Sequence, residues 1–159
     1  MVTRLTVDEA VERVGSGPYL YLLLVVLGLA WVFDGLEVML LSLLGPALKC
    51  DWDLSPEGEA MISMVVFIGM GIGAYSFGAL ADSYGRKASI LTSITLLFAS
   101  AMLSAWSPTY GWMLLFRGIV GISIGGVPVA FSLFSEVVPS KHRGRWGSVL
   151  QGFWPVGSV

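Results

Sequence analysis

Three charged residues lie inside long apolar stretches of this sequence, and their types would allow proton or ion chemistry there. Asp34 and Glu37 lie in the first apolar stretch, and Arg117 lies in the fourth. A charge near the centre of a bilayer costs at least ~2.5–3.5 kcal/mol, so such residues usually face a cavity or a partner. Asp34 and Glu37 are three residues apart and therefore share one face of a helix. These residue types at this spacing predict a charged cluster inside a membrane.

The composition supports a membrane protein. The chain has 159 residues, of which 55% are hydrophobic and 13% are charged, and its mean hydropathy is +0.80. Soluble domains contain about 25% charged residues. The net charge of −2 gives no reason to expect nucleic-acid binding. A single cysteine cannot form an intrachain disulfide, and one cysteine with one histidine gives no reason to expect a metal cluster. We predict that the protein is not an enzyme and that it holds neither a cofactor nor a metal ion.

Four stretches reach the length of about 20 mostly apolar residues that a spanning helix needs. A fifth, over residues 146–159, is too short to cross, and we interpret it as the start of a further helix. Pro46 and the polar run 50–56 are expected to separate the first two spans. The prediction is an all-α transmembrane chain with four complete spans, at about residues 19–48, 61–80, 88–105 and 112–138.

Basic residues in the loops predict the orientation, because cytoplasmic loops are enriched in Lys and Arg. Lys49 alone falls on one side of the predicted spans. The other side holds a larger basic set: Arg4, Arg13, Arg86, Lys87, Lys141, Arg143 and Arg145. We therefore predict a cytoplasmic N-terminus. Residues 1–18 form the leading segment, with a short amphipathic helix expected over residues 7–14 after a capping-box pattern at Thr6 and Glu9.

The predicted depths bring Arg117 close to the two acids of the first span. At ~1.5 Å per residue, counted from Gly45 and Gly111 at the outer ends, Glu37 lies about 12 Å deep, Asp34 about 16 Å and Arg117 about 9 Å. We expect Arg117 to pair with one acid in the outer half of a central cavity. Two interpretations stay open: a static ion pair that orders the first and fourth helices, or a pair that titrates or changes partners.

The join between the second and third spans carries a recognisable motif. Residues 78–87 read G-A-L-A-D-S-Y-G-R-K, and this resembles the major facilitator superfamily loop signature G-x-x-x-D-x-x-G-R-(K/R). Glycine before the arginine permits a tight turn, and an acid beside two basic residues suits a latch between two moving bundles. The resemblance makes this join a cytoplasmic gate motif, whose residues are Gly78, Asp82, Gly85, Arg86 and Lys87.

Glycines in the second span predict close helix packing. Gly71 and Gly78 fall on one stripe, where small residues let a neighbouring helix approach. The run over residues 69–74 is glycine-rich as well, but it lies within an apolar span and lacks the strand that a dinucleotide-binding loop requires. We therefore interpret this run as helix packing.

The fourth span and the loop after it resemble the same superfamily. Arg117, Gly121, Gly125 and Pro128 line one helical face in a pattern similar to its fourth-helix signature, and Pro128 is expected to kink the helix. The following E-x-x-P-x-x-x-R-G is similar to the loop of sugar and organic-ion porters. In this chain its charged members are Glu136 and Arg143, which we assign to the gate.

Residues 34–37, D-G-L-E, resemble the first-helix pattern of aromatic-acid and nicotinate proton symporters. The surroundings G-L-A-W at 28–31 and G-G-V-P at 125–128 are closer to the synaptic-vesicle-two-related (SVOP-like) branch. The resemblance implies the first part of a six-helix N-terminal bundle that works with a C-terminal half absent from this sequence. It also implies alternating access around a midplane site, with Asp34, Glu37 and Arg117 handling protons or a substrate anion.

The expected substrate is a small organic ion or acid, moved in symport with protons across a plasma or vesicle membrane. A sugar porter is the main alternative. A second alternative is a vesicle membrane binding protein of the same shape that transports nothing. A third is a four-span scaffold protein, against which the apolar, unfinished stretch at 146–159 argues.

Overall fold

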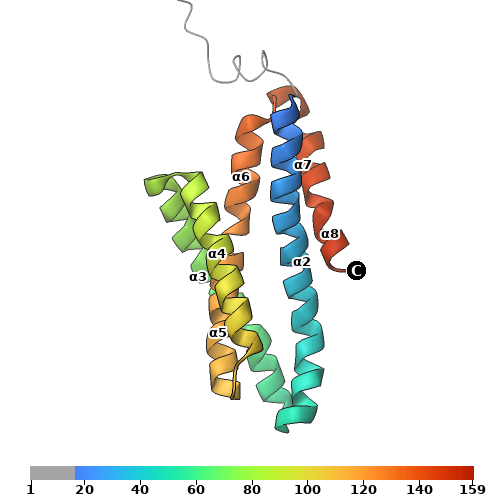
Figure 1. Ribbon diagram of the computed structural model, residues 1–159, viewed down its shortest axis with the longest axis vertical. Helices are drawn as coiled ribbons and strands as arrows, with labels where there is room; N and C mark the ends of the chain where they lie inside the picture. Colours follow the sequence, from blue (N-terminus) through green and yellow to red (C-terminus); the bar gives the residue numbers. More distant parts are fainter. Residues whose placement is uncertain (1–16) are drawn as a thin grey trace, which may run out of the picture.

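The computed structural model describes residues 17–159, with residues 50 and 51 described by their backbone alone. This described part is helical with short connections and has no strand. The helix expected over residues 7–14 lies outside it. The elements in Figure 1 are α2 (Pro18–Trp52), α3 (Pro56–Tyr84), α4 (Arg86–Ala105), α5 (Tyr110–Ile124), α6 (Val127–Val137), η1 (Ser140–His142), α7 (Arg143–Gln151) and α8 (Phe153–Gly157).

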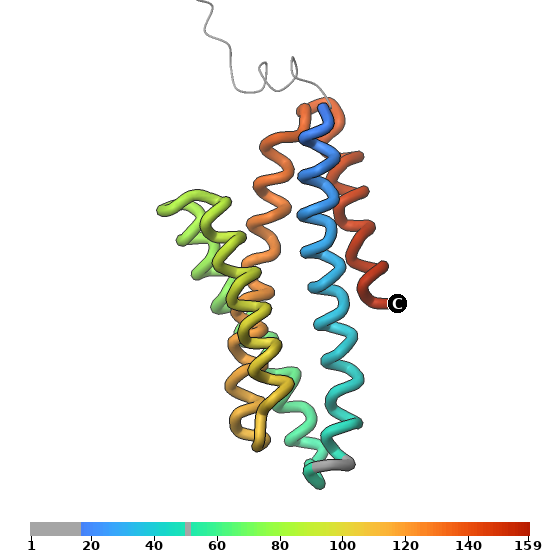
Figure 2. Tube along the Cα trace, viewed as in Figure 1, coloured from blue at the N-terminus to red at the C-terminus, as the bar shows by residue number. Residues whose placement is uncertain are grey.

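Four helical segments of the described chain are long and apolar enough to cross a membrane. They run alternately in opposite directions, so that consecutive segments lie side by side (Figures 1 and 2). The prediction of an all-α transmembrane chain with four spans is confirmed. The segments are Pro18–Lys49, Pro56–Tyr84, Arg86–Ala105 and Tyr110–Val137.

The first two helices leave only a short connection between them. Pro46, predicted to separate the first two spans, lies inside α2, which continues to Trp52. The helix ends where Asp53 adopts a left-handed backbone with φ of 47°. Ser55 then caps α3, because its hydroxyl oxygen accepts a hydrogen bond from the Gly58 N–H at 3.2 Å. The polar run at 50–56 therefore contributes mostly helix ends rather than loop.

The fourth span is broken near its middle, between α5 and α6. Pro128 lies in the first turn of α6 and has no N–H, so it cannot bond the carbonyl four residues earlier, at Ile124, where α5 ends. The Gly126 N–H bonds the Ser123 carbonyl instead, at 3.0 Å. The break lets α5 and α6 follow different directions and still act as one span.

The segment predicted as the start of a fifth span forms two short helices, α7 and α8, which are separated at Gly152. Both run alongside α2 (Figure 2). This brings the end of the described chain back to the middle of the first helix. The closeness of α8 to α2 positions one of the site residues described below.

Apolar side chains pack together where α2, α3, α4, α6 and α7 meet. This core holds Leu20, Leu24, Leu27, Phe77, Ile90, Val129, Ala130, Phe134, Val138 and Leu150. Many large apolar side chains of the same helices are exposed, among them Phe33, Phe67 and Phe98. Long helices that are apolar on their outward faces as well are expected for a chain surrounded by lipid or by further helices.

Candidate functional site

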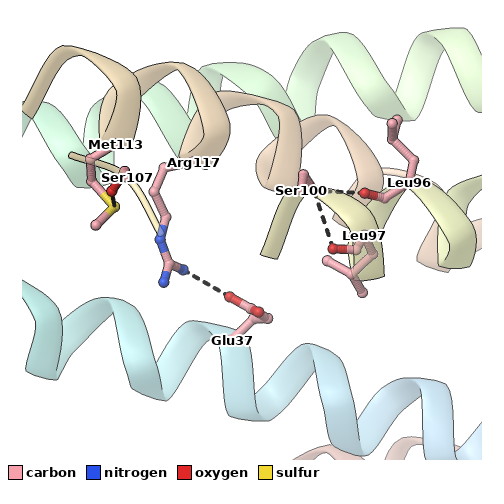
Figure 3. A network of polar contacts seen from close by, with 7 residues as sticks. All are labelled: Glu37, Leu96, Leu97, Ser100, Ser107, Met113 and Arg117. Atoms are coloured by element: carbon pink, nitrogen blue, oxygen red, sulfur yellow. Dashed lines mark hydrogen bonds and ion pairs between the residues drawn. The ribbon is translucent and has the colours of Figure 1, made fainter. Parts of the chain in front are cut away.

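A buried ion pair joins the first and fourth spans. A guanidinium nitrogen of Arg117, on α5, lies 2.8 Å from a carboxylate oxygen of Glu37, on α2. Their side chains are 9% and 13% exposed, and Figure 3 shows them pointing toward one another. The predicted pairing of Arg117 with one of the two acids is confirmed, with Glu37 as the partner. The depth count starts from Gly45 as the outer end of the first span, whereas α2 continues to Trp52, so the pairing is as predicted although the end point of the count is not.

A small hollow adjoins this ion pair between α2, α3 and α5. The pair supplies its charged part, and the remaining lining is apolar: Val38, Leu41, Val66, Phe67, Met70, Val120 and Ile124. Apolar walls keep water away from the charges, so the attraction between Arg117 and Glu37 is stronger than it would be in bulk water. The buried Nε of Arg117 has no hydrogen-bond partner among the described residues.

Asp34 lies one turn along α2 and has a different partner. It is buried, with 7% of its surface exposed, and one of its carboxylate oxygens, Oδ2, accepts a hydrogen bond from the indole N–H of Trp154 at 2.9 Å. Its other oxygen, Oδ1, has no partner among the described residues. The two acids of the first span therefore have different partners: Glu37 forms an ion pair with a cation, and Asp34 accepts a hydrogen bond from an uncharged donor.

Trp154 comes from α8 and is the site residue that the sequence reasoning missed. The sequence does contain a signal for it. Trp residues of membrane proteins concentrate at the two interfaces, and Trp154 lies eight positions beyond Trp146, well inside its apolar stretch. A buried indole N–H usually finds an acceptor, so a deep Trp predicts an acceptor nearby.

Close backbone approach holds α8 against α2. A Cβ added at Gly35 would collide with the carbonyl oxygen of Trp154, and one added at Gly157 would collide with that of Val32. Only glycine fits at these two positions, because the neighbouring atoms belong to backbone and cannot move aside. The crossing therefore fixes the distance between Asp34 and Trp154.

Glycines also allow the helix that carries Arg117 to approach α3. A Cβ at Gly69 or Gly73 would collide with backbone of α5, and one at Gly121 or Gly125 would collide with backbone of α3. Gly71 was predicted on the packing face, but a Cβ there would meet nothing within 4 Å, and Gly78 is equally open. These two residues lie on a face of α3 that points away from α5, so the packing predicted for them stays a prediction.

A second charged cluster lies where α4 begins and α6 ends. A guanidinium nitrogen of Arg86 lies 2.6 Å from a carboxylate oxygen of Glu136, and Arg86 also donates to the hydroxyl of Ser132. Gly85, just before, has φ of 88°, a backbone that side-chain-bearing residues rarely adopt. The structure thus brings together Gly85, Arg86 and Glu136 from the predicted gate.

Other predicted gate residues do not take part in the ion pair of Arg86 and Glu136. Asp82 and Lys87 are exposed and form no ion pair with another described residue. Arg143 is exposed at the start of α7. Pro128, which is predicted to share a helical face of the fourth span with Arg117, is exposed on the first turn of α6. Of the predicted gate residues, the ion pair thus joins Arg86 and Glu136, while Asp82 and Lys87 face outward.

The comparison with family models agrees with this architecture. Residues 39–159 match the model described as sugar (and other) transporter. The chain belongs to the sugar (and other) transporter family. This confirms the resemblance to the major facilitator superfamily that the loop motif indicated.

Relatives of this transporter family cover nearly the whole chain. The chain is 42% identical over 157 residues to organic cation/carnitine transporter 7 of Arabidopsis thaliana, and the aligned region covers 99% of the chain and 31% of that protein. It is 40% identical over 153 residues to the synaptic vesicle 2-related protein of Bos taurus, covering 96% and 28%. It is 38% identical over 148 residues to niacin transporter NiaP of Acinetobacter baylyi, covering 92% and 34%. The chain thus spans about a third of the length of these relatives. The predicted resemblance to the SVOP-like branch is confirmed.

Proposed function

We propose that the protein carrying this chain is a secondary active transporter that moves a small organic ion or acid, in symport with protons, by alternating access. The buried cluster of Asp34, Glu37 and Arg117 carries this proposal. Two acids and one arginine leave one negative charge without a cationic partner in an apolar interior. Such a charge is costly, and a proton or a cationic group of a substrate would neutralise it.

The unequal partners of the two acids support a division of labour. Glu37 is neutralised by Arg117 at 2.8 Å, whereas Asp34 has only the indole N–H and one unpartnered oxygen. Asp34 is therefore our candidate for the residue that gains and loses a proton or meets the substrate. Glu37 and Arg117 would hold the first and fourth spans together, and an ionised Asp34 would compete with Glu37 for Arg117 until Asp34 takes up a proton.

We assign the charged cluster at the other end to the cytoplasmic gate. Arg86 and Glu136 tie the α3–α4 turn to the end of α6, while Asp82 and Lys87 face outward beside them. The exposed face of α3 with Gly71 and Gly78 offers room for a helix of the remaining transporter. In this arrangement the N-terminus is cytoplasmic, the bilayer surrounds the helices, and the membrane is that of the cell surface or of a vesicle.

The names of the relatives agree with a small organic solute. One is named for organic cations and carnitine and another for niacin. The family model is described for sugars and other substrates, so a sugar is the second candidate. The buried charge cluster favours a solute with a cationic group, because a sugar or an anionic acid would depend on a bound proton to neutralise Asp34.

The test is uptake by the intact protein in proteoliposomes, with carnitine, niacin and glucose as the three probes. We expect an inward proton gradient to drive uptake of carnitine or niacin, and Asp34→Asn to abolish the response to that gradient. Glu57→Gln is the matched control, because Glu57 is an exposed acid in the first turn of α3. Uptake of glucose alone, or gradient-driven uptake that survives Asp34→Asn, would refute the proposal.

A further inference from the structure

The hydrogen bond from Trp154 to Asp34 joins α8 to α2. It links residues 120 positions apart and has a donor–acceptor distance of 2.9 Å, typical for N–H···O. It lies at the tight crossing of α2 and α8, where Gly35 and Gly157 exclude any larger residue. Phe153 directly precedes Trp154, and its ring fills the space beside Gly28 of α2. The indole is therefore held on both sides of its bond.

The chemistry of an indole decides what this bond can do. The indole N–H donates and cannot accept, so Asp34 Oδ2 must remain an acceptor in both the ionised and the protonated form of the carboxyl. A proton taken up by Asp34 then belongs on Oδ1, the oxygen without a partner among the described residues. A cationic group of a substrate would approach the same oxygen.

We propose that Trp154 is a positioning residue that fixes the Asp34 carboxyl with Oδ1 as its reactive oxygen. This inference rests on the proposed role of Asp34 in transport. The other charged groups near Asp34 are Glu37 on its own helix and Arg117 on α5, which are paired with each other. The α8 sequence, F-W-P-V-G, contributes no charge. An uncharged donor thus orients Asp34 without neutralising it.

Trp31 provides a matched control on the same helix as Asp34. It lies one turn from Asp34 on α2, and its buried indole N–H has no hydrogen-bond partner among the described residues. Trp31→Phe and Trp154→Phe therefore remove the same atoms, but only the second removes a hydrogen bond to Asp34. A difference between the two variants reports the bond rather than the loss of ring size.

The first test observes the bond directly in the intact protein, reconstituted in lipid nanodiscs with ¹⁵N-labelled tryptophan. The indole N–H resonance that is absent in Trp154→Phe belongs to Trp154. We expect Asp34→Ala to move this resonance upfield by more than those of Trp106 and Trp112, which are exposed and distant from the site. If Asp34→Ala moves all three equally or leaves them unchanged, the inference is wrong.

The second test measures proton-driven uptake with carnitine or niacin, whichever the wild type accumulates. Side-chain hydrogen bonds in membranes have modest strengths, so we expect Trp154→Phe to lower uptake about three- to tenfold and Trp31→Phe to lower it by less than about twofold. Trp154→His, which restores a ring N–H, should recover part of the loss. In substrate exchange without a proton gradient, adding Trp154→Phe to Asp34→Asn should lower the rate no further, because the indole acts through the carboxyl.

The outcomes separate the two proposals. Equal effects of Trp154→Phe and Trp31→Phe, or a further loss in the double variant, would overturn the positioning role while leaving the function of Asp34 intact. If Asp34→Asn keeps gradient-driven uptake, the proposed function fails, and the resonance of Trp154 alone decides the inference. That measurement on Asp34→Ala also decides it where Trp154→Phe unfolds, provided that Trp154→His is used to assign the resonance.

Discussion

The part of the chain that the structure describes contains two arginine–glutamate pairs that differ in their surroundings. Arg117 and Glu37 are 9% and 13% exposed beside an apolar hollow, whereas Arg86 and Glu136 are 33% and 53% exposed at the helix ends. The distances are similar, 2.8 and 2.6 Å. Burial rather than distance therefore sets the free energy needed to separate each pair. This free energy is large for the first pair and small for the second.

The largest expected effect comes from breaking the buried pair. Arg117→Met leaves Glu37 buried without a cation, which we expect to lower the free energy of unfolding by about 3–5 kcal/mol and to abolish uptake. The check is thermal or chemical unfolding of the intact protein in detergent. Adding Glu37→Gln should recover much of the stability, because it removes the orphaned charge. If the single variant keeps wild-type stability, the pair is not as buried as the structure shows.

The next effect tests the helix crossing that carries Arg117 to Glu37. Gly73→Ala places a methyl group against the backbone of α5, so we expect the free energy of unfolding to fall by about 1–3 kcal/mol, with a loss of uptake. Gly71→Ala is the matched control, because a Cβ there meets open space. Unfolding measurements on both variants give the comparison. Equal destabilisation by the two would show that the face of α3 against α5 is assigned incorrectly.

The smallest effect on stability is expected at the exposed pair. Glu136→Gln should change the free energy of unfolding by less than about 1 kcal/mol, since exposed ion pairs contribute little. It should nevertheless change the uptake rate, because we place this pair at the gate. Uptake as a function of salt concentration checks this, since screening should weaken the wild-type pair and leave the variant unaffected. A loss of stability as large as that of Arg117→Met would remove the contrast between the two regions.

The pairing of Arg117 with an acid could be predicted from the sequence, because a charge inside an apolar span needs a partner of opposite sign. The four spans and the tight turn at Gly85 follow equally from local sequence. The positions that could not be predicted depend on contacts between distant segments. Pro46 would end many helices, yet α2 continues through it.

Two further features needed the tertiary structure. Gly71 and Gly73 lie on nearly opposite faces of α3, since a helix turns by about 100° per residue, and only the position of α5 shows which face is buried. The bond from Trp154 to Asp34 requires α8 to return along α2, and the glycines at this crossing, Gly35 and Gly157, lie 122 positions apart along the chain. No local pattern in the sequence predicts which partner Asp34 meets.

The central claim is that the buried cluster has one surplus negative charge, carried by Asp34. It is tested most directly by proton exchange of the purified intact protein in weakly buffered detergent solution, on addition of carnitine or niacin. The account predicts that substrate binding changes the number of protons bound per protein molecule by about one in the wild type and in Glu57→Gln. In Asp34→Asn this number should not change. An equal proton change in Asp34→Asn and the wild type would contradict it.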